Sequence, residues 1–465
     1  MDHSQIISLW QQKYKTAAAQ IEKTAELKFV ATAFNSNIDA VLKISGSKIS
    51  GLANDVALEY ENIEQGENKL NSPHNVVRGI VKCFQHGIAE EWLAEDAAVY
   101  EWMQKNLGYD RLQMGGQAGI IANVLALTGI KNVLVHTASH PRLQAEQFLH
   151  IPNLKAVGDD GKLHIAYETN RQNDIPLVHW IIEFDKGDEC VIGNKTIVCP
   201  KSNRFIATYD PLNSKMHINN YFMNELKQNN FDCLLLSGYH MLQGKSGIEA
   251  VKNSAREIQK LKKTNPQGII HLEIASTQDK AVRSEILNQI AVQSDSLGLN
   301  ERETLDILEL LSPQDFKALN TTELHSPQLF DALCKIKEYT KAPRIQLHMF
   351  GLYVTIQNKK PLIGSNESIS GMLAAATAAA SKAYLSKLEK KSDLCYAAEN
   401  HVGNICLSEL QKLSDYLNSP ELLSSGICNF HNYTVTAIPT IIVEKPKTLV
   451  GMGDTISSLS LLCAR

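Results

Sequence analysis

A short glycine-rich motif near the C-terminus has the composition of an anion-binding site. It consists of Gly451, Met452, Gly453 and Asp454, and it precedes residues that favour a helix. Backbone N–H groups and the helix dipole at a helix N-terminus bind anions. An aspartate there could accept a proton from an attacking hydroxyl while the N–H groups hold the transferring phosphoryl oxygens. The alternative is an ordinary turn in which Asp454 is only the N-cap.

A histidine and a glutamate in the middle of the chain could serve a metal ion. His271 and Glu273 lie toward the end of an apolar segment that predicts a buried strand over 268–275. Residues two apart on a strand share a face, so both side chains would reach the same edge of the sheet. A carboxylate there could hold Mg²⁺, directly or through water. The alternative is a core histidine paired with glutamate.

A second acidic position follows a few residues later. Asn300 and Glu303 stand three residues apart at the start of a helical pattern over 301–311. This spacing is typical of a capping box, in which the two side chains satisfy backbone N–H groups. A second carboxylate near the metal fits the pattern equally well, and the segment alone leaves both alternatives open.

A glycine pair earlier in the chain could bring the backbone close to a ligand. Gly115 and Gly116 precede Gln117 and a predicted helix over 118–127. Such pairs also occur in plain tight turns. The segment from Gly238 to Ser246 resembles a phosphate-binding loop but has five residues between its glycines, where that loop requires four. The sequence contains no complete dinucleotide fingerprint and no nucleophile elbow.

The elements that must position these residues alternate between strands and helices. Apolar runs closed by turn residues predict buried strands over 27–33, 132–137, 231–238 and 268–275, with a polar turn over 35–39. Helical patterns lie between them over 118–127, 250–263, 301–311 and 371–388. Strand–helix alternation predicts an α/β fold, with a mostly parallel central sheet covered by helices on both faces.

Two regions interrupt this alternation and predict a second, smaller unit. Residues 45–108 are polar with few strand signals, and residues 151–208 contain short alternating runs typical of antiparallel hairpins. We expect both to form a discontinuous α+β lid over the carboxyl edge of the sheet, where open α/β sheets bind ligands. The large domain would then comprise 1–44, 109–150 and 209–465.

Composition excludes several classes of protein. The 465 residues are 44% hydrophobic and 21% charged, which is typical of a globular chain with a sizeable core. The formal charge of −4 and the lack of a basic block argue against nucleic-acid binding. The nine scattered cysteines and the lack of a long apolar stretch predict a cytoplasmic protein with no membrane partner, and we expect a monomer.

The ordered set of motifs resembles the ADP-dependent sugar kinases, a family of glucokinases and phosphofructokinases in the ribokinase-like superfamily. The matching segments run in the family's order from residue 35 to residue 458. They are Asn35-x-Asn37-x-Asp39, Gly115-Gly116-Gln117-Ala118-Gly119, Asn203-Arg204-Phe205-Ile206, His271-x-Glu273, Asn300-x-x-Glu303 and Gly451-x-Gly453-Asp454. The glycine motif alone indicates only the superfamily, whereas the two acidic motifs with the Asn-Arg segment are much more specific.

The resemblance implies transfer of the β-phosphate of Mg-ADP to a sugar hydroxyl, with release of AMP. Asp454 would then be the general base, and Gly451, Met452 and Gly453 would supply the amides of an anion hole. Arg204 would reach the β-phosphate from the lid. The metal shell would contain Glu273 and Glu303, with Asn300 near the phosphates.

The resemblance also implies substrate contacts. Asn37, Asp39, Gly115, Gly116 and Gln117 would hold sugar hydroxyls. The segments that border adenine in the family correspond here to a strand over 348–353, with His348 and Tyr353, and to Ile438 and Thr440.

The residues expected to contact the sugar point to two different substrates. Glu91 and His179 match positions that glucose-using members employ. Lys162 falls where a phosphate-binding lysine of the phosphofructokinases would lie. We therefore expect both glucose and fructose 6-phosphate to be substrates. An ATP-dependent carbohydrate or nucleoside kinase and a non-catalytic sugar or nucleotide sensor on the same fold are the alternatives.

Overall fold

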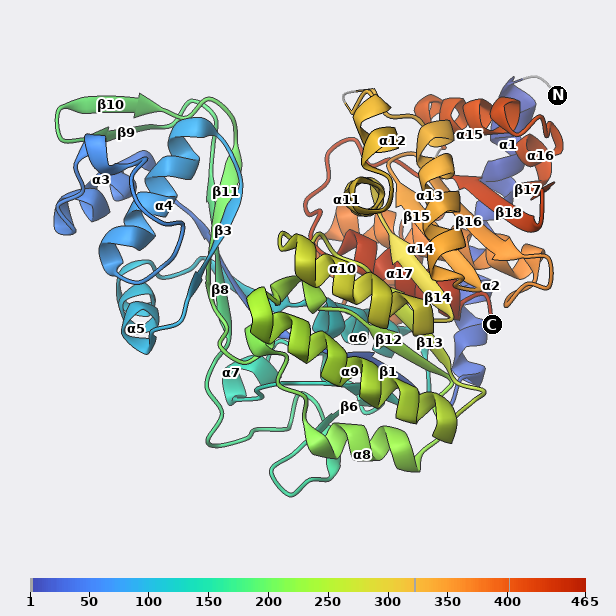
Figure 1. The fold of residues 1–465 in the computed structure, drawn as a ribbon, viewed down its shortest axis with the longest axis horizontal. Helices are drawn as coiled ribbons and strands as arrows, with labels where there is room; N and C mark the ends of the chain where they lie inside the picture. The colour runs from blue at the N-terminus through green and yellow to red at the C-terminus, as the bar shows by residue number, and fades with distance from the viewer. Residues whose placement is uncertain (1–2, 322, 401) are drawn as a thin grey trace.

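The computed structural model describes residues 3–321, 323–400 and 402–465 and contains two main sheets, each with its own hydrophobic core, and a separate two-stranded hairpin (Figure 1). The larger sheet has eleven strands and the smaller has five. The first helix, α1 (His3–Tyr14), and the C-terminus lie on the large part, and the smaller sheet projects to one side of it (Figure 1). The expected α/β fold, with a large central sheet flanked by helices, is confirmed.

The large sheet is parallel at its centre and antiparallel at its margins. Its order is β17-β18-β16-β15-β14-β13-β12-β1-β5-β6-β7, and the pairs from β15 to β6 are parallel. The strands in chain order are β1 (Val30–Ala33), β5 (Val133–Val135), β6 (Leu154–Val157), β7 (Leu163–Ile165), β12 (Cys233–Leu236), β13 (Ile269–Glu273), β14 (Ser296–Leu299), β15 (Arg344–Met349), β16 (Leu352–Asn358), β17 (Ile427–Phe430) and β18 (Tyr433–Pro439).

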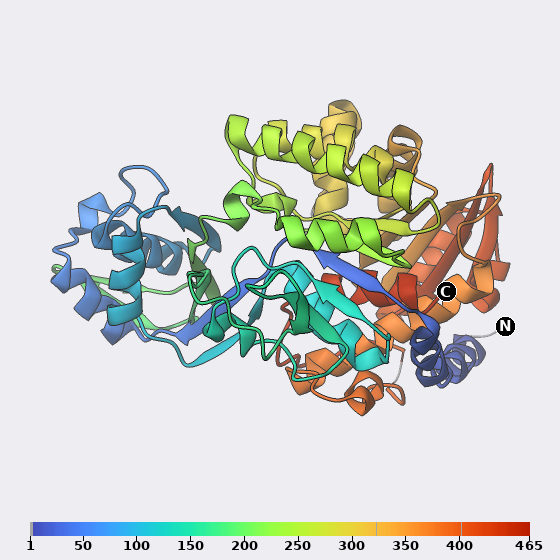
Figure 2. The ribbon, with the colours of Figure 1, turned by 90° about the horizontal axis from the view of Figure 1, so that it is seen from below.

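Helices cover both faces of this sheet, as expected for buried parallel strands (Figure 2). One face carries α8 (Asn220–Gln228), α9 (Gly244–Thr264), α10 (Lys280–Gln289), α11 (Glu301–Leu311), α12 (Pro313–Ala318), α13 (Ser326–Thr340) and α15 (Asn404–Tyr416). The other carries α1 (His3–Tyr14), α2 (Ala17–Lys23), α6 (Gln117–Thr128), α14 (Ser365–Leu385) and α17 (Met452–Leu462). Short helices α7 (Arg142–Ala145) and α16 (Glu421–Ser425) complete the large part.

The smaller sheet has the order β3-β11-β8-β2-β4. Its strands are β2 (Asn37–Lys43), β3 (Glu90–Ala94), β4 (Arg111–Gly115), β8 (Val178–Phe184) and β11 (Asn203–Tyr209). The helices α3 (Gly46–Asp55), α4 (Pro73–His86) and α5 (Ala97–Asn106) lie on one side, and a hairpin of β9 (Glu189–Ile192) and β10 (Lys195–Val198) packs against α3 and α4 (Figure 1).

The limits of the two domains differ from those predicted, because several strands belong to a different sheet than expected. Strands β2 and β4 belong to the smaller sheet, although their residues fall in the ranges expected for the large domain. Strands β6 and β7 belong to the large sheet, although residues 151–208 were expected in the lid. The alternating pattern of a short strand does not show which sheet the strand joins. The strand it pairs with is distant in sequence and leaves no local signal.

Two local expectations are wrong. The polar segment over 35–39 was expected to be a turn, but from Asn37 onward it is strand β2, which pairs with β4 and β8. The single strand expected over 348–353 is instead a reversal between antiparallel β15 and β16 around Phe350 and Gly351. In the first segment, the polar residues Asn35 and Ser36 lie where the chain passes between strands, and in the second the reversal contains Gly351, whose φ is +88°.

The described residues contain no helix that is both long enough and apolar enough to cross a membrane.

Candidate active site

The aspartate of the C-terminal motif lies in the first turn of α17. Gly451 is the N-cap, with a left-handed φ of 65°, and Asp454 is three residues further on. The alternative in which Asp454 is the N-cap is therefore wrong. Its carboxylate is buried, with 8% of the residue exposed, and Oδ1 accepts a hydrogen bond from Gln117 Nε2 at 3.0 Å.

Burial governs the ionisation of Asp454. Removal from water raises the pKa of this carboxyl above its usual value, while the nearby Lys382 ammonium and the Gln117 hydrogen bond lower it. Lys382, on α14, donates to the Gly451 carbonyl at 3.2 Å. A buried carboxylate with a raised pKa at a helix N-terminus has the properties of a general base for a hydroxyl group.

Gln117 joins Asp454 to the junction between the two sheets. It is the first residue of α6, and its N-cap Gly116 follows directly after strand β4. While Nε2 donates to Asp454, Oε1 accepts from the Gly238 backbone N–H at 3.0 Å, just beyond β12. One side chain therefore fixes three segments that meet at the carboxyl edge of the large sheet.

The predicted sugar contacts pack tightly beside this junction. Asn37 Nδ2 donates to Asp39 Oδ1 at 2.9 Å, and both residues are buried at the start of β2. A Cβ atom on Gly115 would lie 2.1 Å from Asp39 Oδ1, and Gly116 has a φ of +72°. Glycine is required at both positions, because any side chain would displace the polar pair or strain the backbone.

The smaller sheet supplies the opposite wall of a cavity of about 210 Å³. Glu91 Oε1 accepts from Thr208 Oγ1 at 2.7 Å, and His179 Nε2 lies 3.1 Å from Asp210 Oδ2. Burial opposes protonation of His179, but its contact with Asp210 raises its pKa overall. The cavity is lined by Asn37, Asp39, Glu91, Gly116, Gln117, His179, Arg204, Gly451 and Asp454 among others, so most predicted sugar residues meet Asp454 there.

Arg204 enters this cavity from β11, the strand that pairs with β8. Its side chain is exposed, unlike the buried polar groups around it. An exposed guanidinium on a cavity wall is free to form bidentate contacts with an incoming phosphate.

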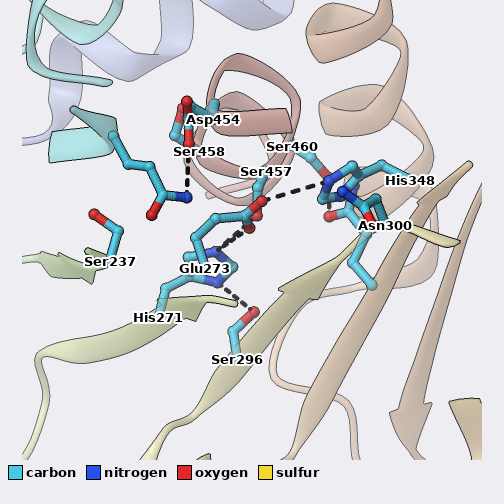
Figure 3. A network of polar contacts seen from close by, with 12 residues as sticks. Ser237, His271, Glu273, Ser296, Asn300, His348, Asp454, Ser457, Ser458 and Ser460 are labelled. Atoms are coloured by element: carbon cyan, nitrogen blue, oxygen red, sulfur yellow. Dashed lines mark hydrogen bonds and ion pairs between the residues drawn. The ribbon is translucent and has the colours of Figure 1, made fainter. Parts of the chain in front are cut away.

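Glu273 lies at the end of β13 within a buried polar network (Figure 3). Its Oε1 is 3.4 Å from His348 Nε2, and its Oε2 is 3.7 Å from His271 Nε2 and makes no hydrogen bond. His271 in turn contacts Ser457 Oγ at 2.8 Å and Ser296 Oγ at 3.0 Å. Burial, followed by the charge of Glu303, raises the pKa of Glu273 well above its usual value.

The second acidic motif forms the capping box of α11. Asn300 Oδ1 accepts from the Glu303 N–H at 3.0 Å, and Glu303 Oε2 accepts from the Asn300 N–H at 2.8 Å. The helix-start interpretation is therefore confirmed. It does not exclude a metal role, because burial and the charge of Asp454 raise the pKa of Glu303 to about 8. A buried carboxylate facing other acids is a position that a cation would stabilise.

The predicted adenine residues occupy adjacent antiparallel strands. His348 pairs with Tyr353, and Tyr353 pairs with Ile438, while Thr440 follows β18 directly. All four are buried. His348 also faces the glycine motif, since a Cβ on Gly453 would lie 3.0 Å from its Nε2, and neither ring nitrogen has a hydrogen-bond partner. The structure thus places His348, on β15, next to both Glu273 and the glycine motif.

Lys162 is not brought to the cavity. It lies exposed in the turn between β6 and β7, at the margin of the large sheet, and does not contribute to the cavity lining. The prediction missed several residues that line or border the cavity, His240 and Lys382 among them. His240 follows β12, in a segment considered only as a phosphate loop, and Lys382 is a lone cation within the alanine-rich helix α14.

Within the described ranges, no group of three or more His, Cys, Asp or Glu side chains is arranged as a metal site. The orphaned Glu273 Oε2 and the buried Glu303 nevertheless fit an oxygen-seeking cation. Mg²⁺ is commonly bound by one or two carboxylates together with water and substrate phosphates, rather than by a complete protein cage.

Comparison with known proteins identifies the family. A model of the ADP-specific phosphofructokinase/glucokinase conserved region matches residues 28–463. The chain belongs to this family. The resemblance inferred from the motifs is therefore confirmed, and the activity of the family is ADP-dependent phosphoryl transfer, as expected from the sequence.

Relatives carry both names found in the family description. The chain is 30% identical over 460 residues to the ADP-dependent glucose/glucosamine kinase of Pyrococcus abyssi, covering 97% of each protein. It is 27% identical over 472 residues to the ADP-specific phosphofructokinase of Methanosarcina acetivorans, covering 97% of this chain and 96% of that protein.

Solved structures of the family have the same architecture. The last common ancestor of ADP-dependent phosphofructokinases from Methanosarcinales superimposes with a TM-score of 0.86 and 31% identity, covering 100% of this chain and 99% of the ancestor. An ADP-dependent kinase in complex with fructose 6-phosphate and ADPβS gives a TM-score of 0.81 and 30% identity, covering 100% and 98%.

Proposed function

We propose that this enzyme transfers the β-phosphate of Mg-ADP to a hydroxyl group of glucose or of the sugar in fructose 6-phosphate, releasing AMP. The observation that carries the proposal is the position of the buried Asp454 carboxylate. It lies at the N-terminus of α17 and lines the same cavity as Asn37, Asp39 and Glu91. A sugar held by those groups would meet a base and an anion-binding helix end together.

Asp454 would accept the proton of the attacking hydroxyl as the new O–P bond forms and the bond to AMP breaks. The backbone N–H groups of Gly451, Met452 and Gly453 would hold the transferring phosphoryl oxygens. Arg204 would neutralise charge on the same group from the opposite wall, as a guanidinium matches phosphate geometry. His348, Tyr353, Ile438 and Thr440 would border the adenine, with His348 also near the phosphates.

Mg²⁺ would be held near Glu273 and Glu303, with Asn300 close to the phosphates. When bound, the metal would neutralise the negative charge of the diphosphate. Within the chain, Glu273 Oε1 lies on the side of the glycine motif, 3.5 Å from where a Cβ on Gly453 would be, and would accept a water ligand there. The capping box fixes the orientation of Glu303 for the same purpose.

Two residues support use of glucose. Glu91 and His179 reach the cavity from the smaller sheet, and each is held by one polar neighbour. One feature favours fructose 6-phosphate, namely Arg111 in the cavity lining, because a sugar phosphate needs a cation. Lys162 directly precedes β7 of the large sheet and lies outside the cavity lining, so we propose that it reaches the sugar phosphate when the smaller domain closes over the sugar.

The setting of the enzyme is also part of the proposal. All nine cysteines are free, which suits a reducing compartment, so we infer a cytoplasmic enzyme. We further infer that it acts as a monomer in a glycolytic pathway, with no nucleic-acid or membrane partner.

The test is a steady-state comparison of donors and acceptors. AMP or phosphorylated sugar is measured with glucose and with fructose 6-phosphate, each with Mg-ADP and with Mg-ATP. We expect turnover of both sugars with ADP and at most weak turnover with ATP. Preference for ATP would favour the ATP-dependent alternative, and binding without turnover of either sugar would favour the sensor. Lack of glucose turnover alone would remove the dual-substrate part.

A further inference from the structure

Lys382 is a cation at the catalytic helix that the motifs do not include. It lies in the last turn of α14, which packs along α17. The two helices approach closely, since a Cβ on Gly371 would lie 2.4 Å from the Ser460 carbonyl oxygen. Close helix contact holds the position of Lys382 fixed relative to the start of α17.

The Lys382 ammonium contacts the first turn of α17 directly. Its Nζ donates to the Gly451 carbonyl at 3.2 Å, and the same oxygen accepts from Thr455 N at 3.2 Å and Thr455 Oγ1 at 2.8 Å. A Cβ on Gly451 would lie 2.7 Å from Nζ. Glycine at this position therefore leaves room for the ammonium as well as permitting the positive φ.

The charges around Asp454 are mostly negative. Glu273 on β13 and Glu303 on α11 repel its carboxylate, and Asp39 on β2 lines the same cavity. Arg204 and Arg111 stand on the smaller sheet, across the cavity. Lys382 approaches from the large domain itself, and it lowers the pKa of Asp454 against the effect of burial. Its own pKa is lowered by burial to about 8, while Asp454 and Asp39 act to raise it.

We propose that Lys382 is a positioning residue of the phosphoryl transfer, which keeps Asp454 ionised and holds the first turn of α17 in place for the sugar hydroxyl. The inference rests on the proposed role of Asp454 as the base. Because Lys382 stays with α17 whatever the position of the smaller domain, it provides this counter-charge before the sugar is enclosed.

A second cavity gives experimental access to this ammonium. It measures about 220 Å³ and is lined by Lys382, Ile120, Val450 and Leu388, and by the exposed Lys387. A small alkylammonium ion could occupy the space that a truncated Lys382 side chain would leave.

The experiment compares Lys382→Met, Lys382→Gln and Lys382→Arg with the matched control Lys387→Met. For Lys382→Met we expect kcat to fall about tenfold or more on the acid limb of its pH profile and this limb to move up by about one pH unit, with KM for ADP little changed. Lys382→Arg should retain most activity, and Lys387→Met should match the wild type. Ethylammonium should partly restore a Lys382→Ala variant.

Lys382→Gln addresses the possibility that the Met variant folds poorly. Its amide can still donate to the Gly451 carbonyl but carries no charge, so we expect a near-normal thermal midpoint with the acid limb still shifted. An unshifted acid limb in a folded Gln or Met variant would overturn the proposal. If Asp454→Asn keeps its turnover, the base assignment and this inference fail together. If Asp454→Asn is inactive and the Lys382 profiles match the wild type, this inference alone fails.

Discussion

Gln117 Nε2 lies 3.0 Å from Asp454 Oδ1, joining residues 337 positions apart in the chain. Gln117 begins α6 directly after the chain leaves the smaller sheet, and Asp454 begins α17 at the other end of the sequence. The same amide receives the Gly238 N–H on its oxygen, which fixes which end of the amide faces Asp454. The carboxylate is therefore oriented by the segment that connects the two domains.

Loss of this bond should impair transfer more than binding. Gln117→Leu removes the donor to Asp454 and leaves the Gly238 N–H unsatisfied, so we expect kcat to fall on the order of 10²-fold through misplacement of the base. Gln117→Glu is the comparison, since it keeps the size but adds repulsion. Steady-state kinetics with saturating ADP measure the effect. A kcat within twofold of wild type for Gln117→Leu would contradict this role.

Arg204 should stabilise the phosphoryl group during transfer and contribute little to the affinity for the nucleotide. Arg204→Ala removes the cation from the cavity wall, and we expect kcat to fall on the order of 10²–10³-fold while AMP binding, measured by calorimetry, changes little. Lys201→Ala is the matched control, an exposed cation three residues earlier that does not line the cavity. Equal losses in the two variants would show that the effect of Arg204 is not local.

Removal of the Glu303 carboxylate should weaken the binding of Mg²⁺. Glu303→Gln preserves the size of the side chain and part of the capping box, so the start of α11 should stay intact. We expect the Mg²⁺ concentration for half-maximal activity to rise roughly 10–100-fold. The control is Glu309→Gln, on the same helix but paired with Lys280 on the outside. An unchanged Mg²⁺ titration for Glu303→Gln would exclude Glu303 from the metal shell.

A buried histidine makes the stability of the fold depend on pH. Burial lowers the pKa of His140 to about 4, against an ordinary value of 6.5, and its Nε2 contacts the Ala166 carbonyl at 2.8 Å. Between these values the unfolded chain binds a proton that the folded chain does not. The stabilisation is therefore present above about pH 6.5 and is lost as the pH falls toward 4.

The corresponding measurement is the thermal midpoint of His140→Gln at pH 7 and at pH 5. In the wild type, His140 should account for about 2 kcal/mol of stability lost between these pH values. The variant, whose amide can replace the contact with Ala166, should therefore lose less on acidification. His217→Gln, at an exposed histidine, serves as the control. An identical pH dependence in His140→Gln and wild type would contradict the assignment.

The motifs predicted about half of the residues that line the cavity, because each motif has a local pattern. The residues of the glycine motif, the two acidic motifs and the glycine pair at 115–116 stand at ends of strands or starts of helices, where turn and capping residues are visible in the sequence. Parallel strands then bring these ends to one edge. That is why Asp454, Gln117 and Asp39, far apart in the chain, line one cavity.

The parts that could not be predicted depend on tertiary pairing. The assignment of β2 to the smaller sheet depends on β4 and β8, and that of β7 to the large sheet depends on β6. The role of Lys382 could not be predicted from its sequence position, a single lysine in an alanine-rich helix. Its position near Asp454 becomes visible only because α14 packs against α17.

The most direct test of the central claim is the kinetics of Asp454→Asn. The amide keeps the size of the carboxylate but cannot accept the hydroxyl proton as a base. We predict that kcat falls on the order of 10²–10⁴-fold while the affinities for sugar and ADP change little, and that Asp415→Asn, on an exposed helix face, has no effect. Turnover of Asp454→Asn close to wild type would contradict the account.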